Sequence, residues 1–259
     1  MTVRGADLPA IYPDLKGRQV LISGGATGIG QSLVEAFARQ GSRTAFVDID
    51  TGAGQALEEK LVEEGLQVLF RPCDITDVRG YQSTIHEIAD HFGPISVLVN
   101  NAANDVRHAL DEISYERFDE LIAVNLKHQM FAAQAVVPMM RQVSRGSIIN
   151  FGSMGWMMAA PGYPVYAASK AAVHGMTRAL ARDLGGEGIR VNTLVPGWVM
   201  TEKQLKLWVD DKARELIERS QCLQGPLLPE HIAQMALFLA SDASAMCSAQ
   251  NFIVDGGWV

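Results

Sequence analysis

Short apolar segments alternate with longer amphipathic segments along this chain. The apolar segments contain about 4–6 residues, which is too short for a typical helix, and their nearly uninterrupted hydrophobicity is typical of strands buried on both faces of a sheet. We predict strands at residues 19–23, 44–47, 67–70, 96–99, 147–151, 190–195 and 251–254.

The segments between these strands repeat their apolar residues at helical spacing. We predict helices at residues 52–64, 78–91, 115–141 and 229–240, two more that end near residues 40 and 185, and helical stretches between residues 197 and 221. Strands that alternate with helices indicate a parallel sheet with both faces covered. No internal repeat, low-complexity segment or linker divides the sequence, so we expect one domain over residues 1–259.

The composition excludes several classes of protein. The chain has 259 residues, 48% of them hydrophobic, and a formal net charge of −7. No apolar run approaches the about 18–20 residues of a membrane span, and residues 1–16 lack the apolar core of a signal peptide. The acidic balance argues against nucleic acid and against acidic protein partners. We therefore expect neither a membrane nor a nucleic acid as partner.

The cysteines indicate a reducing compartment. Cys73, Cys222 and Cys247 are odd in number and widely spaced, and none belongs to a CxxC or Cys/His cluster. This usage is typical of a reduced cytoplasmic protein without structural zinc, so we expect no metal.

Residues 150–170 carry a candidate catalytic group. This stretch places Ser153 just beyond a predicted strand, and it sets Tyr166 and Lys170 four positions apart near the start of a helix, on one helix face. A free tyrosine has a pKa of about 10, and lowering it by about 3 units requires about 4 kcal/mol from a neighbouring cation. Tyr166 is then a candidate general acid/base, and Ser153 a candidate donor to the reacting oxygen. The alternative is a helix with two amphipathic side chains on one face.

A glycine-rich segment, Gly24-x-x-x-Gly28-x-Gly30, follows the first predicted strand and precedes a helix. Glycines let the backbone turn tightly and approach a pyrophosphate, and the helix N-terminus offers unpaired N–H groups. We interpret this segment as the phosphate loop of a dinucleotide site. The alternative is a glycine-rich turn without a ligand.

Asp48 ends the second predicted strand. A carboxylate there can accept both ribose hydroxyls of NAD and repels the 2′-phosphate of NADP, and neither Thr27 nor Ile49 supplies a positive charge. We therefore predict NAD as the cofactor; the alternative is an ordinary strand-end or helix-cap acid. Asp74, after the third strand, is a candidate for contacting adenine or for capping the next helix. Residues 100–103 would place small side chains beside the cofactor.

Together these motifs resemble the short-chain dehydrogenase/reductase family over essentially the whole chain. The matching residues are Gly24-x-x-x-Gly28-x-Gly30, Asn100-Asn101-Ala102, Asn125, Ser153, Tyr166-x-x-x-Lys170 and Pro196-Gly197-x-x-x-Thr201. The resemblance implies a single Rossmann-like α/β domain, with a doubly wound, seven-stranded parallel sheet and helices on both faces, and a homotetramer. The chain departs from the usual pattern at Ser23, where threonine is commoner, and at Ala103, where glycine is commoner. Neither change removes a group that the mechanism needs.

The resemblance also implies roles for the matching residues. Tyr166 is the acid/base, Lys170 lowers its pKa and holds the nicotinamide ribose, and Ser153 orients the substrate oxygen. Asn125 helps to organise a water-linked proton path to Lys170, and Thr201 lies near the nicotinamide carboxamide. The residues that we assign to the dinucleotide are Gly24, Thr27, Gly28, Ile29, Gly30, Asp48, Asp74, Ile75, Asn101, Ala102, Ala103, Tyr166, Lys170, Pro196, Gly197, Val199 and Thr201.

Within the family, the chain looks most like the bacterial sugar 1-dehydrogenases, which act on pentoses and hexoses such as L-arabinose, D-galactose and D-xylose. The similarity lies in residues 100–108, 125–129, 221–223 and 254–258. It implies NAD-dependent oxidation of a cyclic aldose at C1 to the aldonolactone. Two alternatives stay open: a 3-oxoacyl reductase that uses the same groups in the opposite direction, and a catalytically silent NAD-binding protein.

A polyol substrate needs several hydrogen-bonding groups and an apolar or aromatic wall. The residues that we expect to contact it are Asn104, Ser153, Trp156, Tyr166 and Gln204, with Asp105, His108, Met154 and Trp208 as further candidates. The alternative for each is a solvated loop position or a packing role. Residues 199–225 are expected to form a lid on the substrate side.

Overall fold

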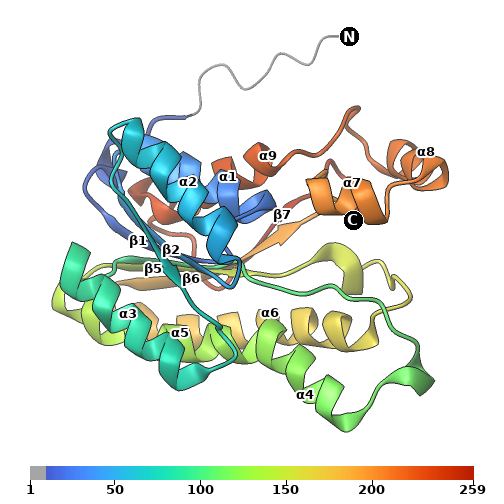
Figure 1. Cartoon of the computed structure of the whole chain (residues 1–259), viewed down its shortest axis with the longest axis horizontal. Helices are drawn as coiled ribbons and strands as arrows, with labels where there is room; N and C mark the ends of the chain where they lie inside the picture. The colour runs from blue at the N-terminus through green and yellow to red at the C-terminus, as the bar shows by residue number, and fades with distance from the viewer. Residues whose placement is uncertain (1–9) are drawn as a thin grey trace.

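The computed structural model describes residues 10–259, so residues 1–9 of the predicted N-terminal arm lie outside the described residues. Seven parallel strands form one sheet in the order β3-β2-β1-β4-β5-β6-β7 (Figure 1). The strands are β1 (Gln19–Ser23), β2 (Arg43–Asp48), β3 (Val68–Pro72), β4 (Val97–Asn100), β5 (Gly146–Phe151), β6 (Ile189–Pro196) and β7 (Asn251–Val254). The predicted seven-stranded parallel sheet is confirmed.

Helices cover both faces of this sheet (Figure 1). One face carries α1 (Gly28–Arg39), α2 (Thr51–Glu63) and α9 (Pro229–Ala240), and the other carries α3 (Val78–Phe92), α5 (His128–Gln142) and α6 (Pro164–Leu184). None of the helices between residues 10 and 259 is long and apolar enough to cross a bilayer.

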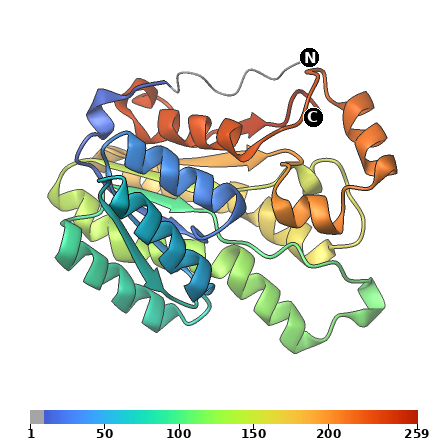
Figure 2. The same cartoon turned by 45° about the horizontal axis from the view of Figure 1, so that its top comes forward.

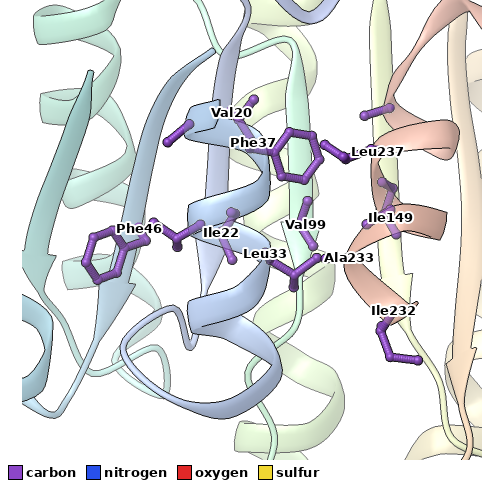
Figure 3. Close-up of a cluster of buried hydrophobic side chains, with 14 of the residues drawn as sticks. Val20, Ile22, Leu33, Phe37, Phe46, Val99, Ile149, Ile232, Ala233 and Leu237 are labelled. Atoms are coloured by element: carbon purple, nitrogen blue, oxygen red, sulfur yellow. The ribbon is translucent and has the colours of Figure 1, made fainter. Parts of the chain in front are cut away.

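The first of these faces is held by an apolar cluster. Leu33 and Phe37 of α1 meet Leu237 of α9 over the strand residues Ile22 and Val99, all fully buried (Figure 3). Burying one such side chain contributes about 1.5–3 kcal/mol, so the cluster accounts for a large share of the force that attaches α1 and α9 to the sheet. This packing fixes α1, and with it the loop that precedes it.

The helix predicted at residues 115–141 is interrupted. It consists of α4 (Tyr115–Ile122), a π-helical turn (Ala123–Lys127) and α5. A π turn inserts one extra residue into the helical ladder and frequently marks a functional position. Here it contains Asn125, whose side chain turns toward the loop after β4.

The predicted lid contains two short helices, α7 (Glu202–Leu207) and α8 (Asp211–Ser220). They lie at the same end of the molecule as the C-terminus, beyond the end of β6 (Figures 1 and 2). The parallel strands all point their carboxyl ends to this side, which is where open α/β sheets bind ligands.

Candidate active site

The crevice lies where the order of the sheet reverses. β1 pairs with β2 on one side and with β4 on the other, so the loops after β1 and β4 leave the sheet in opposite directions. Asn101, directly after β4, bridges this gap, because its Nδ2 donates to the carbonyls of Ser23 at 3.0 Å and Gly24 at 2.8 Å. The Ser23 hydroxyl in turn accepts from the Ala102 N–H at 3.2 Å. Serine at position 23 therefore supplies the hydroxyl that this position requires.

The glycine-rich loop forms a cradle that side chains would fill. A Cβ on Gly24 would lie 2.8 Å from the Ala102 Cα, and one on Gly30 would lie 1.7 Å from the Gly24 carbonyl oxygen. Gly28 adopts φ +57°, a left-handed conformation that favours glycine. Among residues 10–259, no side chain caps the first turn of α1, and that turn carries no acidic residue. These residues fit the pyrophosphate of a dinucleotide.

Asp48 lies beside this cradle at the end of β2. Its Oδ2 accepts from the Ala26 N–H at 3.0 Å, and its Oδ1 accepts from the Asp50 N–H at 3.1 Å. The neighbouring Ile49 is exposed. The carboxylate is therefore tied to the glycine loop and half-exposed at its edge.

The residues after β3 include Asp74, which the sequence offers as an adenine contact or as the cap of the next helix. Asp74 accepts at Oδ1 from both the N–H and the hydroxyl of Thr76, at 2.8 and 2.7 Å. Asp77, not Asp74, caps α3 by accepting from the Gly80 N–H. Ile75 is buried in the core on the α3 side of the sheet. Asp74 thus stabilises a turn, and the helix cap lies three residues later than expected.

Tyr166 and Lys170 lie in the first two turns of α6, which begins at Pro164. Proline suits this first position, because its missing N–H would be unpaired in any case. The Lys170 Nζ lies 5.7 Å from the centre of the Tyr166 ring. It donates to the Phe151 carbonyl, at the end of β5, over 2.7 Å. Ser153, just beyond β5, accepts from the Gly155 N–H at 3.1 Å and begins a short turn.

The protein alone does not give Tyr166 the lowered pKa predicted from its spacing to Lys170. Burial raises the pKa of Tyr166 above its usual value, and the nearby Ser153 hydroxyl opposes this only in part. Burial also lowers the pKa of Lys170 to about 7, so its positive charge is itself weakened. Both pKa shifts arise because burial removes the two side chains from water, which disfavours their charged forms. The Lys170 ammonium donates its hydrogen bond to the Phe151 carbonyl.

Asn125 uses its side chain to clamp the loop after β4. Its Oδ1 accepts from the Asn104 N–H at 2.8 Å, and its Nδ2 donates to the Asn104 carbonyl at 3.0 Å. The Asn125 carbonyl accepts from the Gln129 Nε2 at 3.3 Å. Asn125 therefore holds the backbone of Asn104 in place near the pocket.

His128 supports the same loop. It is fully buried, and its Nε2 lies 3.1 Å from the Ala102 carbonyl. Burial and the nearby Lys170 charge lower the pKa of His128 to about 3, so the ring is neutral at physiological pH.

A pocket of about 510 Å³ opens beside these groups. Of the residues predicted to bind substrate or cofactor, those that line it are Ile29, Asn101, Ala103, Asp105, Ser153, Met154, Tyr166, Lys170, Pro196, Gly197, Val199, Thr201 and Gln204. The structure thus brings the candidate acid/base, its neighbours and one edge of the glycine loop to a single cavity.

Two of the five expected substrate contacts, Trp156 and Asn104, lie outside the lining, as do the further candidates His108 and Trp208. The Trp156 ring turns to His174, with ring centres 5.0 Å apart and its Nε1 donating to His174 Nε2 at 3.3 Å. The Asn104 side chain accepts from the Val106 N–H at 3.2 Å and shapes its own loop. Both expectations rested on nearness in sequence, which does not fix the direction of a side chain.

Other lining residues were not predicted as contacts. The Arg107 guanidinium packs on the Tyr163 ring in the wall of the pocket. Trp198 donates from Nε1 to the Gln204 Oε1 at 3.0 Å. Arg107, Tyr163 and Trp198 lie within the motif segments 100–108, 150–170 and 196–201. Their place in these segments is the sequence signal that indicates them.

The comparisons with known proteins agree with this geometry. A family profile described as enoyl-(acyl carrier protein) reductase matches residues 24–259. The chain is 42% identical over 249 residues to the D-xylose 1-dehydrogenase of Caulobacter vibrioides, covering 96% of this chain and 98% of that protein. It is 43% identical over 247 residues to a Rhizobium meliloti protein named "Probable galactose dehydrogenase", covering 95% and 96%.

The fold is equally well matched among solved structures. A crystal structure of a Sinorhizobium meliloti 1021 protein superposes with a TM-score of 0.90 at 28% identity, covering 95% of this chain and 98% of that one. With the profile and the dehydrogenase relatives spanning nearly all of the sequence, the chain belongs to the short-chain dehydrogenase/reductase family of oxidoreductases.

Proposed function

We propose that this protein oxidises the C1 hydroxyl of a cyclic aldose to the aldonolactone, with NAD as the cofactor. The observation that carries the proposal is the convergence of Ser153, Tyr166 and Lys170 on one pocket that the glycine loop borders. The names of the two dehydrogenase relatives support a pentose or hexose as the substrate class.

The roles of the chain's residues follow from their positions. Tyr166 takes the proton of the C1 hydroxyl as general base, and Ser153 donates a hydrogen bond to the same oxygen. Lys170 holds the ribose beside the nicotinamide. Bound NAD supplies the hydride acceptor. Because burial raises the pKa of Tyr166, the phenol holds its proton firmly in the protein alone, and oxidation is favoured by alkaline pH.

Asp48 supports NAD over NADP. Its half-exposed carboxylate at the edge of the glycine loop suits the two ribose hydroxyls and repels a 2′-phosphate. No arginine or lysine stands at Thr27 or Ile49 to compensate that repulsion.

The purified protein should reduce NAD when it is mixed with a panel of D-xylose, L-arabinose, D-galactose and D-glucose at mildly alkaline pH. NADH absorbance follows the rate, and mass spectrometry identifies the lactone or its hydrolysed acid. The same panel with NADP measures cofactor preference. If no pentose or hexose yields NADH, the sugar assignment is wrong.

The second candidate is a reductase of a 3-oxoacyl substrate, which the acyl carrier protein in the description of the matching family favours. The same three residues would then deliver a proton to a keto oxygen, in the opposite direction. The Asp48 carboxylate and the net charge of −7 count against NADPH and an acidic carrier protein. Faster oxidation of NADPH with acetoacetyl-CoA than reduction of NAD with any aldose would favour this candidate.

We also propose a homotetramer in the cytoplasm. Large apolar side chains on and before α4 are exposed, namely Leu110, Tyr115 and Phe118, which is consistent with a subunit contact. The cysteines of the described residues are unpaired, as suits a reducing compartment. Size-exclusion chromatography with light scattering measures the assembly directly, and a monomeric mass would contradict it.

A further inference from the structure

Arg107 lines the pocket and contacts two aromatic rings. Its guanidinium carbon is 4.0 Å from the centre of the Tyr163 ring and 5.1 Å from the centre of the Trp208 ring. Tyr163 in turn packs edge-on against Tyr166, with ring centres 5.3 Å apart. One aromatic ring therefore separates the guanidinium from the candidate acid/base. Contacts with both rings hold the charged group in place.

The guanidinium has hydrogen-bond donors to spare. Its Nη1 donates to the Pro161 carbonyl at 3.2 Å, but its Nε is buried without an acceptor. The carboxylate on the same loop, Asp105, is already engaged by the Lys203 Nζ at 2.7 Å and the Gln204 Nε2 at 2.9 Å. Within residues 10–259, no carboxylate pairs with Arg107.

Several apolar side chains share this pocket with the guanidinium. Met154, Met158, Pro161 and Leu216 line the same pocket. A buried N–H without an acceptor is unfavourable, and a charged one more so. Among residues 10–259 no acceptor pairs with the Nη2 of Arg107, so this end of the guanidinium is suited to donate to neighbouring oxygen atoms on a ligand.

We propose that Arg107 recognises the end of the sugar remote from C1, by donating hydrogen bonds to neighbouring hydroxyl groups there. The assignment rests on the proposed function, and it names the residue that determines which ring hydroxyls are accepted. In this arrangement Tyr166 and Ser153 contact the reacting oxygen, and Tyr163 provides an aromatic wall. Arg107, which packs on the Tyr163 ring, donates to the hydroxyls farthest from C1. Aldoses with two free hydroxyls at this end are the substrates that it favours.

A purely structural role makes a different prediction. Arg107 also links the loop after β4 to Trp208, which follows α7 in the lid. If it served only to hold the lid, its removal would slow every substrate by a similar factor. The two roles are therefore separated by substrates with and without remote hydroxyls.

The test compares Arg107→Met with the wild-type protein on two substrates. Methionine keeps much of the apolar stem and removes every donor. The first substrate is whichever of D-xylose and D-galactose the wild type oxidises faster. The second is 2-hydroxytetrahydropyran, which has the ring and the C1 hydroxyl of a pyranose and no other hydroxyl. If its turnover is too slow to follow, its inhibition constant against the sugar replaces kcat/KM.

We expect Arg107→Met to lower kcat/KM for the sugar by about 10- to 150-fold, mostly through KM, because hydrogen bonds from a charged donor are lost. The value for 2-hydroxytetrahydropyran should stay unchanged. Lys203→Met, which breaks the link between the lid and Asp105, should affect both substrates by the same factor. Arg107→Lys keeps the charge and should recover part of the loss; it also replaces Arg107→Met if that variant does not fold.

Equal losses for both substrates with Arg107→Met would overturn the assignment in favour of a lid role. Unchanged sugar kinetics would overturn it as well. Failure of the wild-type protein to oxidise any aldose would refute the proposed function itself, so the two failures are distinguishable.

Discussion

The carboxylate of Asp48 should determine the choice between NAD and NADP, and Asp48→Asn tests this with little structural change. The Oδ2 of Asp48 accepts from the Ala26 N–H in the glycine loop, and asparagine retains an oxygen for that bond. The negative charge is removed together with the acceptor for the Asp50 N–H, while the bond to the glycine loop is kept. The change therefore separates the electrostatic role of the side chain from its role in shaping the loop.

Two effects contribute to the expected change. Hydrogen bonds to a charged acceptor contribute about 1.5–3 kcal/mol and those to a neutral one about 0.5–1.5 kcal/mol, so NAD loses about 1 kcal/mol. Two unit charges about 4 Å apart near a protein surface repel by about 4 kcal/mol before screening. Half-exposure of Asp48 reduces this to about 2 kcal/mol. The loss of about 1 kcal/mol for NAD and the removal of about 2 kcal/mol of repulsion for NADP sum to about 3 kcal/mol. This corresponds to a change of about two orders of magnitude in the selectivity for NAD over NADP.

Calorimetric titration of NADH and NADPH measures this selectivity without any sugar. The wild-type protein should bind NADH more tightly, and Asp48→Asn should lower the ratio of the two affinities by about 100-fold at low salt, and less at high salt. Asp50→Asn is the matched control, because Asp50 is exposed two residues away and only caps α2 through the Ala53 N–H. An affinity ratio that does not change in Asp48→Asn would refute the reasoning.

Three further predictions concern the catalytic residues and the cradle. Tyr166→Phe should lower turnover by about 10²- to 10⁴-fold and leave NADH binding intact, as followed by NADH absorbance and calorimetry; undiminished turnover would exclude Tyr166 as the base. Burial lowers the pKa of Lys170 to about 7, against about 10.5 in the unfolded chain, so the unfolded state binds more protons between these values and stability rises with pH in that window. Lys170→Met should therefore raise Tm most below pH 7, by up to the equivalent of about 5 kcal/mol less the lost hydrogen bond, and this gain should vanish as the pH rises past about 10.5; thermal unfolding across that range checks it, and a constant Tm difference would contradict it. Gly30→Ala should abolish NADH binding, because the added Cβ would lie 1.7 Å from the Gly24 carbonyl oxygen, whereas Gly175→Ala, with nothing within 4 Å on an exposed helical face, should stabilise by about 0.5–1 kcal/mol; equal NADH affinities in the two variants would show that the cradle is not needed.

The fold could be predicted from the sequence because hydrophobic periodicity reflects burial directly. Strands buried on both faces and amphipathic helices leave distinct patterns, and each strand was placed to within a few residues. The π turn at Asn125 could not be predicted in this way. One inserted residue barely shifts the apolar repeat, and the turn coincides with a contact of Asn125 with Asn104, 21 positions away, that no local pattern contains.

The site, like the fold, could be predicted only in part from the sequence. The spacing of Tyr166 and Lys170 correctly places both on one helix face. It does not reveal that Lys170 turns to the Phe151 carbonyl or that burial raises the pKa of Tyr166. The stack of Arg107 on Tyr163 joins residues from two different loops, and spacing contains no information about such a contact.

The packing of α9 on α1 has a consequence for biosynthesis. Phe37 and Leu237 meet across most of the length of the polypeptide (Figure 3). Until the last helix and strand have been synthesised, the part of α1 that packs against α9 stays exposed to solvent. The nascent chain is therefore prone to aggregation. The phosphate cradle at the start of α1 should therefore become rigid only after release of the finished polypeptide, and shortening the C-terminus should impair folding before it impairs chemistry.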